Sequence, residues 1–212
     1  GVWSRMAPAD RRRILLLFSE LILANREELA LLETLNVGKP IANAYNGDTV
    51  SVAACIAWYA EAIDKVYGEV AATAHDMTTL VVREPLGIVA AVVPWNYPMS
   101  MAAWKLGPAL ATGNSVILKP AEQSPFTALK FGELAIEAGI PPGVLNVVPG
   151  LGHIAGKALG LHMDVDCVGF TGSTEVGKYF MQYSGQSNIK RIGLELGGKS
   201  PQVVLADCDD LD

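Results

Sequence analysis

Short apolar runs alternate with helical patterns from residue 88 onward, and this alternation restricts the possible folds more than any other feature. Residues 88–93 are β-branched residues and alanines without interruption, which is typical of a strand buried on both faces. Strands that alternate with helices predict βαβ units and a twisted parallel sheet. Further strands are expected at 116–118, 144–148, 167–171, 191–196 and 202–205, with helices from about 100 and at 124–138, 153–161 and 173–183.

The first part of the chain predicts helices followed by one strand. Pro8 suits the first turn of a helix, and Asn25 followed by Glu28 resembles a capping box that starts a second helix. A third helix is expected at 49–66, and the alternating residues 78–83 predict a strand. The apolar face of the first helix is expected to comprise Ile14, Leu17, Phe18, Leu21 and Ile22.

Charge and cysteine content argue against several classes of function. The formal net charge of −6 is unlike that of nucleic-acid-binding proteins, which normally carry a basic stripe. No apolar run reaches the length of a membrane-spanning helix, and no signal peptide is visible. The three cysteines are widely spaced and form neither a disulfide framework nor a zinc pattern, so a cytoplasmic location is expected.

Glycines, prolines and polar residues follow five successive predicted strands. In parallel α/β sheets, ligands bind outside the carboxyl ends of the strands. One composite ligand site at this edge of the sheet therefore explains these segments better than five unrelated turns. The segments are 94–98, 119–122, 149–152, 171–173 and 195–199.

Two of these segments resemble phosphate-binding turns. Gly172 and Ser173 open a helix directly after a strand, where backbone N–H groups favour an anion such as a pyrophosphate. An ordinary Ser N-cap is the alternative interpretation. Residues 150–155 fit the pattern G-x-G-x-x-G/A between a strand and a helix. The acidic residue expected at the end of the next strand is missing, so this turn is not a standard dinucleotide fingerprint.

Glu195 stands among aliphatic neighbours and is followed closely by Gly197 and Gly198. A carboxyl group in an apolar setting tends to have a raised pKa, which suits it to proton transfer near neutral pH. The paired glycines allow a tight turn or the close approach of a ligand. The alternative is a glutamate at the end of a strand whose carboxylate is solvated.

Five motifs occur in the order and approximate spacing seen in the aldehyde dehydrogenase superfamily, and the resemblance covers residues 1–212. Five collinear motifs are far more specific than any one of them. The sequence of residues 184–209 most resembles the branch of this superfamily that oxidises amino- and guanidino-aldehydes. The motifs are PWNYP at 94–98, WKLGPAL at 104–110, KPAE at 119–122, FTGSTEVG at 170–177 and LELGGK at 194–199.

The resemblance implies oxidation of an aldehyde to a carboxylic acid with NAD(P)⁺, through a Cys thiolate that attacks the aldehyde. Asn96 matches the amide that binds the developing oxyanion, and Glu195 matches the base that activates the hydrolytic water. Lys105 matches a lysine that relays this proton, with a helix-surface lysine as the alternative. The side chains interpreted either as lining of the aldehyde tunnel or as helix packing are those of Tyr97, Met101 and Trp104.

The same resemblance implies a nicotinamide cofactor site. Lys119 and Glu122 match ribose-binding residues, and because a carboxylate would repel a 2′-phosphate, we expect a preference for NAD over NADP. Gly172 and Ser173 match the pyrophosphate turn, and Gly152 matches a turn on the adenine side. The other positions matched to cofactor binding are Val93, Trp95 on the nicotinamide side, Phe170, Val176 on the adenine side, and Leu196.

The nucleophilic Cys of the family lies a few dozen residues beyond the position of Glu195. None of Cys55, Cys167 and Cys208 fits that position, so they are interpreted as ordinary thiols. We therefore expect the chain to end before the catalytic domain and not to oxidise an aldehyde by itself. The alternative is a non-catalytic NAD-binding or assembly module. A phosphate-transfer enzyme is disfavoured because the Walker A lysine is absent.

The resemblance also implies the architecture: an α/β fold with a Rossmann-like twisted parallel sheet and flanking helices. Residues 1–68 are expected to be helical and to pack on the cofactor domain. Residues 69–84 are expected to form a projecting hairpin of the oligomerisation region, and residues 85–212 the NAD-binding domain. The full-length enzyme is expected to be a homo-oligomer that acts on an aldehyde, with no nucleic acid or membrane as partner.

Overall fold

A five-stranded parallel sheet forms the centre of the structure, a computed structural model that describes residues 1–198 and 200–208. The strand order is β5-β4-β3-β6-β7, and all four pairings are parallel. This confirms the predicted α/β fold with a parallel sheet. The strands are β3 (Ile88–Val92), β4 (Ser115–Lys119), β5 (Leu145–Val147), β6 (Cys167–Gly172) and β7 (Arg191–Leu196).

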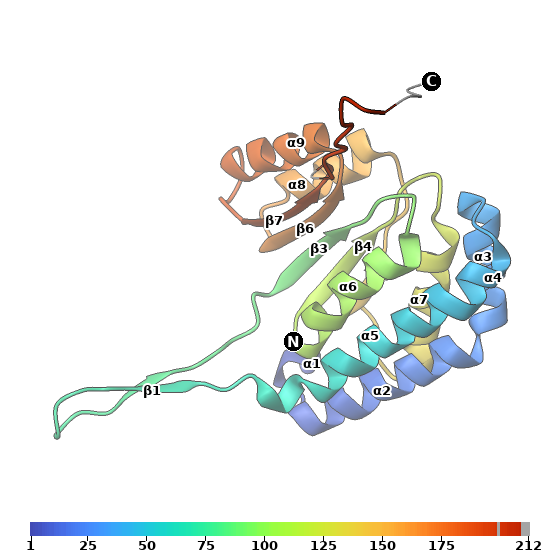
Figure 1. Ribbon diagram of the computed structural model, residues 1–212. Helices are drawn as coiled ribbons and strands as arrows, with labels where there is room; N and C mark the ends of the chain where they lie inside the picture. The colour runs from blue at the N-terminus through green and yellow to red at the C-terminus, as the bar shows by residue number, and fades with distance from the viewer. Residues whose placement is uncertain (199, 209–212) are drawn as a thin grey trace.

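Helices cover both faces of this sheet (Figure 1). One face carries α6 and α7, with α2 and α5 packed outside them, and the other face carries α8 and α9. The α-helices are α1 (Val2–Arg5), α2 (Pro8–Ala24), α3 (Arg26–Val37), α4 (Ile41–Asn43), α5 (Thr49–Glu61), α6 (Pro98–Ala111), α7 (Phe126–Glu137), α8 (Lys157–Leu161) and α9 (Thr174–Gly185). Short helices of other types span Ala44–Asp48, Ile63–Lys65 and Gly152–Gly156.

The side chains of β3 enter the two cores alternately, as the period of a strand requires. Val89 and Ala91 belong to the core under α6, and Ala90 and Val92 belong to the core under α9. All four are buried, which explains why this stretch of the sequence is continuously apolar.

The order of the strands reverses at β3. The chain proceeds from β3 to β4 and β5 on one side, then crosses to form β6 and β7 on the other. Val92 is level with Lys119 in β4 and with Phe170 in β6. The loops that leave these three strands therefore start at the same edge of the sheet, at a topological switch point where open α/β sheets bind ligands.

The first long helices form as predicted, with two local corrections. In α2, the buried side chains include Leu15, Phe18 and Ile22, whereas Leu17 is 41% exposed and lies off the buried face. Asn25 makes no capping hydrogen bond to α3, so the predicted capping box is wrong. Its side-chain Nδ2 instead donates to the carbonyl of Leu21 at 2.9 Å and thereby ends α2.

A hairpin projects from the body of the molecule (Figure 1). Its strands, β1 (Glu69–Ala71) and β2 (Thr79–Val81), pair antiparallel and are exposed along their whole length. The predicted strand at 78–83 is therefore present but shorter. The preceding helix α5 ends at Glu61 and continues only as a single 3₁₀ turn, so the helix predicted at 49–66 is also shorter.

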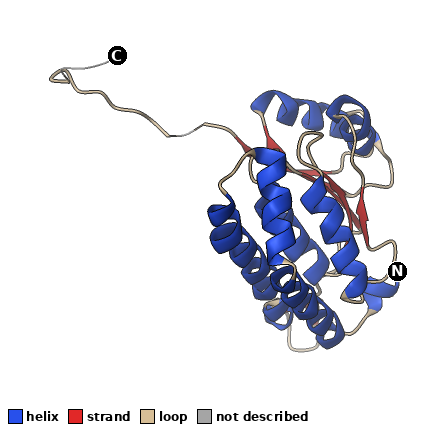
Figure 2. Ribbon diagram, turned by 90° about the vertical axis from the view of Figure 1, so that its right-hand side faces the viewer, coloured by secondary structure: helices blue, strands red, loops and turns tan. Residues whose placement is uncertain are grey.

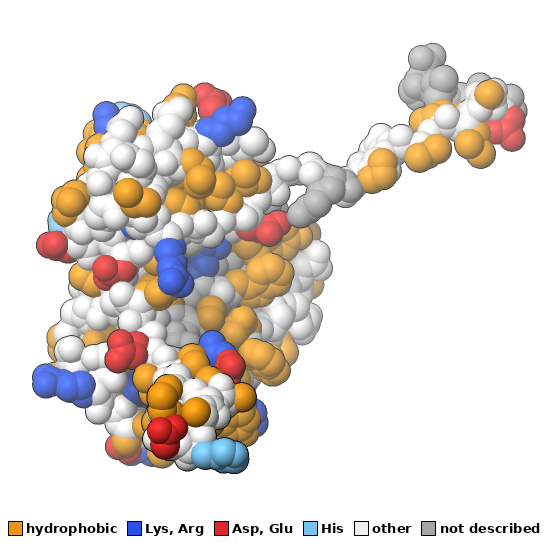
Figure 3. Space-filling model, turned by 90° about the vertical axis from the view of Figure 1, so that its left-hand side faces the viewer, with side chains coloured by type: hydrophobic (Ala, Val, Ile, Leu, Met, Phe, Trp, Pro, Cys, Tyr) orange, Lys and Arg blue, Asp and Glu red, His pale blue; other side chains and the backbone are white. Residues whose placement is uncertain are grey.

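The strand predicted at 202–205 does not form. Beyond Gly197 and Gly198 the chain leaves the sheet as an extended segment (Figure 2). Its apolar side chains, Val203, Val204 and Leu205, are 78%, 59% and 68% exposed. Figure 3 shows hydrophobic side chains along the projecting arm. A strand needs a neighbour for its backbone N–H and C=O groups, and this segment has none among the described residues.

None of the helices in the described ranges combines the length and the apolar character needed to cross a bilayer.

Candidate cofactor and acid–base site

A cleft of about 670 Å³ opens at the carboxyl edge of the sheet. It brings together residues from four strand ends and from the turn that follows the fifth, as expected for one composite site. All ten residues matched to cofactor binding, as well as Asn96 and Glu195, line this cleft. The ten are Val93, Trp95, Lys119, Glu122, Gly152, Phe170, Gly172, Ser173, Val176 and Leu196.

A buried lysine and an exposed carboxylate face each other at the end of β4. Lys119 is 3% exposed, and its Nζ donates to the carbonyl of Pro120 at 2.9 Å and to Glu122 Oε2 at 3.4 Å. The pKa of Glu122 is lowered, chiefly by its own backbone N–H and further by Lys119 and the backbone N–H of Gly152. The charged carboxylate of Glu122, in the loop after β4, thus interacts with the backbone of Gly152 in the loop after β5.

The start of α9 forms a close-packed turn against the sheet. The Ser173 hydroxyl accepts a hydrogen bond from the Val176 N–H at 3.3 Å, so the predicted N-cap is present. A Cβ on Gly172 would lie 2.5 Å from the ring of Phe170, so this position requires glycine. The cap uses one N–H of the first turn, and the remaining N–H groups can bind an anion. The two interpretations of this turn are therefore compatible.

Lys105 reaches the same edge of the sheet from α6. Its Nζ donates to Thr171 Oγ1 at 2.5 Å, and its aliphatic carbons pack 3.7 Å from where a Cβ on Gly169 would be. Burial lowers the pKa of Lys105 to about 8, against the opposing effect of the negative charge on Glu195. Lys105 is therefore a partly buried lysine within the electrostatic reach of Glu195.

Thr171 is the residue that sequence reasoning did not assign a role. It lies opposite Glu195 in the register of β6 and β7 and holds the ammonium group of Lys105. Its place in the strand-end segment 171–173 indicated the composite site, but its contact with Lys105 depends on how α6 packs on the sheet.

Glu195 itself is exposed, which contradicts the apolar setting expected from its sequence neighbours. The reason is its position: β7 is the edge strand of the sheet, and Leu194 next to it is also 36% exposed. Asn96 and Trp95 are exposed as well, in the loop after β3. Lys199, at the end of the same motif as Glu195, lies outside the described residues.

The cysteines lie away from the cleft. Cys55 belongs to α5, and Cys167 begins β6 at the edge of the sheet opposite the cleft. Burial raises the pKa of both thiols, which disfavours the nucleophilic thiolate. Cys208 is exposed in the C-terminal segment. None of the three lines the cleft, in agreement with their interpretation as ordinary thiols.

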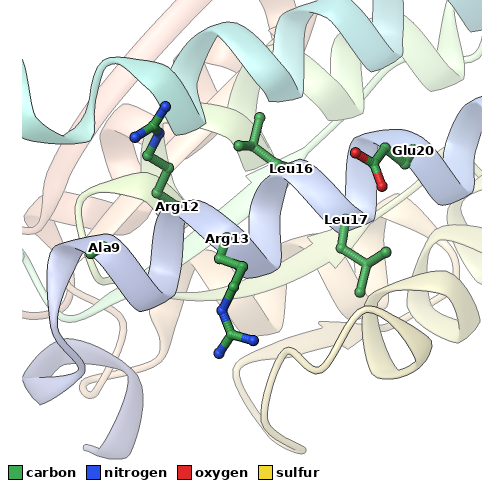
Figure 4. A pocket seen from close by; sticks show the side chains of 6 residues that line it. All are labelled: Ala9, Arg12, Arg13, Leu16, Leu17 and Glu20. Carbon is green, nitrogen blue, oxygen red and sulfur yellow. The ribbon is translucent and has the colours of Figure 1, made fainter.

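A second hollow lies on the surface of α2 and differs from the strand-end cleft in the residues that line it (Figure 4). Arg12, Arg13 and Glu20 supply its charged groups, and Arg12 is already paired with Glu61 at 2.6 Å. All of its lining residues come from one helix, so it lacks the convergent loops of the strand-end cleft. Within the described parts of the chain, no group of acidic, His and Cys residues could hold a metal ion.

Comparison with known proteins agrees with the geometry. The pattern that defines the Aldehyde dehydrogenase family matches residues 1–212. The NADP/NAD-dependent aldehyde dehydrogenase PuuC of Escherichia coli (strain K12) is 56% identical over 211 residues, which are 100% of this chain and 43% of that protein.

Solved structures show the same relationship. The crystal structure of an indole-3-acetaldehyde dehydrogenase with NAD⁺ has a TM-score of 0.94 and 61% identity, covering 99% of this chain and 42% of that one. A gamma-glutamyl-gamma-aminobutyraldehyde dehydrogenase from Burkholderia cenocepacia J2315 has a TM-score of 0.93 and 59% identity, with coverage of 99% and 42%. The chain thus spans less than half the length of these relatives.

Proposed function

The chain belongs to the aldehyde dehydrogenase family, and we propose that it supplies the cofactor site and the acid–base groups for oxidation of an aldehyde to a carboxylic acid. The observation that carries this proposal is the meeting of charged groups at one cleft. Lys119, Glu122 and Glu195 line the cleft. Lys105 does not line it, but it is hydrogen-bonded to Thr171, which does, and it is within the electrostatic reach of Glu195.

The residues of the cleft fit a dinucleotide. Gly172 has no side chain, so its backbone can approach a pyrophosphate. The first turn of α9 offers N–H groups, and Glu122 offers oxygen acceptors for ribose hydroxyls. A dinucleotide held by these residues would supply the hydride acceptor for the oxidation. The charged carboxylate of Glu122 would repel a 2′-phosphate, so we propose that NAD binds more tightly than NADP.

The acid–base roles follow from the positions of three side chains. The Asn96 amide donates a hydrogen bond to the substrate oxygen, where negative charge develops. Glu195 removes a proton from the water that hydrolyses the acyl intermediate, and Lys105 stabilises the carboxylate and passes the proton onward. A lysine with a pKa of about 8 can both release and accept a proton near neutral pH.

The nucleophile is not assigned to a residue of this chain, because no cysteine lines the cleft. We propose that residues 1–212 alone bind NAD without oxidising an aldehyde. Calorimetric titration of the chain with NAD⁺ and with NADP⁺ tests the cofactor site, and the absorbance of NADH after addition of an aldehyde tests turnover. Absence of NAD⁺ binding would overturn the cofactor site. NADH production would overturn the assignment of the cysteines.

The aldehyde class and the assembly are further parts of the proposal. Trp95 and Tyr97 flank Asn96 in the chain and are 57% and 49% exposed, and Trp104 within α6 is 61% exposed. Such aromatic faces suit a cationic aminoaldehyde. The exposed hairpin β1–β2 suits pairing with another chain, so we propose a homo-oligomer of the longer enzyme. Three free cysteines agree with a reducing cytoplasm. Comparing the oxidation of amino-aldehydes with that of alkyl-aldehydes by the longer enzyme tests the aldehyde class. Sedimentation of the longer enzyme tests the homo-oligomer.

A further inference from the structure

Three ionisable side chains form a buried cluster near the loop that carries Asn96, and the roles proposed above do not use them. Lys39 Nζ lies 3.2 Å from Glu33 Oε1 and also donates a hydrogen bond to Asp48. The side chain of Glu33 is fully buried, and those of Lys39 and Asp48 are 12% and 15% exposed. Burying charged groups is costly unless they pair, so both carboxylates depend on the ammonium group of Lys39, which pairs with each of them.

The backbone fixes where these charges lie. Glu33 is in α3, which ends at Gly38 in the left-handed conformation with φ +72°. Lys39 follows immediately, and its side chain reaches back to Glu33. Asp48 ends the π-helical segment directly before α5. The cluster therefore ties three consecutive N-terminal segments together.

The same ammonium group contacts the substrate-side loop. Lys39 Nζ lies 4.1 Å from the centre of the Tyr97 ring, within the range of a cation–π interaction. Tyr97 directly follows Asn96 in the chain and is the N-cap residue of α6. Its carbonyl accepts the first helical hydrogen bond, from the Met101 N–H at 2.9 Å.

Glu33 also acts on the start of α6 through its charge. Burial raises the pKa of Glu33, while Lys39 and the backbone N–H of Met99 favour its charged form. Pro98 has no N–H, so Met99 carries the first backbone donor that this helix offers. Glu33 Oε2 makes no hydrogen bond of ordinary geometry within the described residues. The carboxylate thus acts on the helix N-terminus electrostatically, as an anion is expected to do.

We propose that Glu33, Lys39 and Asp48 are positioning residues that hold the 94–98 loop and thereby fix the place of the Asn96 amide. Lys39 holds the Tyr97 ring, and Glu33 and Asp48 hold the ammonium group of Lys39 in place. The chemical role of Asn96 rests on the function proposed above. The positioning of the loop does not, so it is tested by a measurement that needs no enzymatic activity.

The test is NMR of the whole chain, with the side-chain amide signal of Asn96 assigned by its loss in Asn96→Asp. Tyr97→Leu removes the ring from a half-exposed side chain, and Lys39→Met removes the charge at similar length. Both are expected to shift or broaden the Asn96 signal. Both are also expected to raise the exchange rate of the Met101 amide about tenfold, while the Val116 amide in β4 keeps its rate.

Conservative variants separate positioning from general stability. Lys39→Arg and Tyr97→Phe keep the cation and the ring, and both are expected to retain the wild-type Asn96 signal. Lys130→Met removes a lysine that pairs with Glu28 and Glu133 and does not contact the loop, so it serves as the matched control. An unchanged Asn96 signal in Tyr97→Leu would overturn the proposal. So would an equal rise in exchange at Met101 and Val116.

Discussion

Replacing Lys105 with Met should stabilise the chain near neutral pH, because the partly buried ammonium group is costly there. The pKa of Lys105 falls from its ordinary 10.5 to about 8, and each pKa unit corresponds to about 1.4 kcal/mol. The full shift would amount to about 3 kcal/mol, which solvent screening at a partly buried group reduces to about 2 kcal/mol. Loss of the hydrogen bond to Thr171 offsets about 1 kcal/mol of this gain.

The pH dependence distinguishes this cause from simple repacking. Below the folded-state pKa of about 8 the cost is fully present. Between about 8 and 10.5 the unfolded state binds more protons than the folded state, so the wild-type stability rises with pH relative to the variant. We expect Lys105→Met to be more stable by about 1 kcal/mol near pH 7 and less stable by about 1 kcal/mol above pH 10.5.

Urea unfolding of both proteins across this pH range, followed by tryptophan fluorescence, measures the difference. Lys178→Met, at an exposed position of α9, is the matched control and should change the free energy of unfolding near pH 7 by no more than about 0.5 kcal/mol. A constant difference between Lys105→Met and the wild type at all pH values would refute the argument, because it would mean that the ammonium group is not desolvated.

Three further substitutions test the cleft and the packing. Glu122→Gln should narrow the preference for NAD over NADP by about fivefold in calorimetric titration, since an exposed carboxylate contributes at most about 1 kcal/mol; an unchanged ratio would contradict the assignment. Gly172→Ala should weaken NAD⁺ binding at least about tenfold, because its Cβ would lie 2.5 Å from the ring of Phe170; wild-type affinity would show that the turn does not approach the cofactor. Gly107→Ala places a Cβ 2.5 Å from Tyr59 where α6 crosses α5, and should cost about 1–3 kcal/mol in urea unfolding; a neutral result would mean that the two helices separate easily.

Local sequence pattern was sufficient for most of the architecture. The continuous apolar run of β3 requires helices on both sides of the sheet, and the alternation of strands and helices requires parallel pairing. Because parallel strands all end at one edge, the residues after each strand could be predicted to share a cleft. That is where Glu122, Gly172 and Glu195 are found.

The errors occurred where a local pattern depended on a partner elsewhere in the chain. The apolar segment at 202–205 has the composition of a strand, but no neighbouring strand satisfies its backbone among the described residues. Glu195 has apolar neighbours in sequence, but β7 lies at the edge of the sheet and leaves it exposed. Asn25 has the residue type of an N-cap, but its side chain bonds backward to Leu21.

The sequence by itself determined the sheet, the edge at which ligands bind and the types of residue found there, because these follow from periodicity and from the direction of parallel strands. Only the tertiary structure decided which side chains act together. Lys105 is hydrogen-bonded to Thr171, which lies 66 residues further along the chain. Lys39, which follows α3, contacts the ring of Tyr97, which precedes α6. Such contacts depend on how α3, α6 and β6 pack in three dimensions, and no periodicity within a segment carries that information.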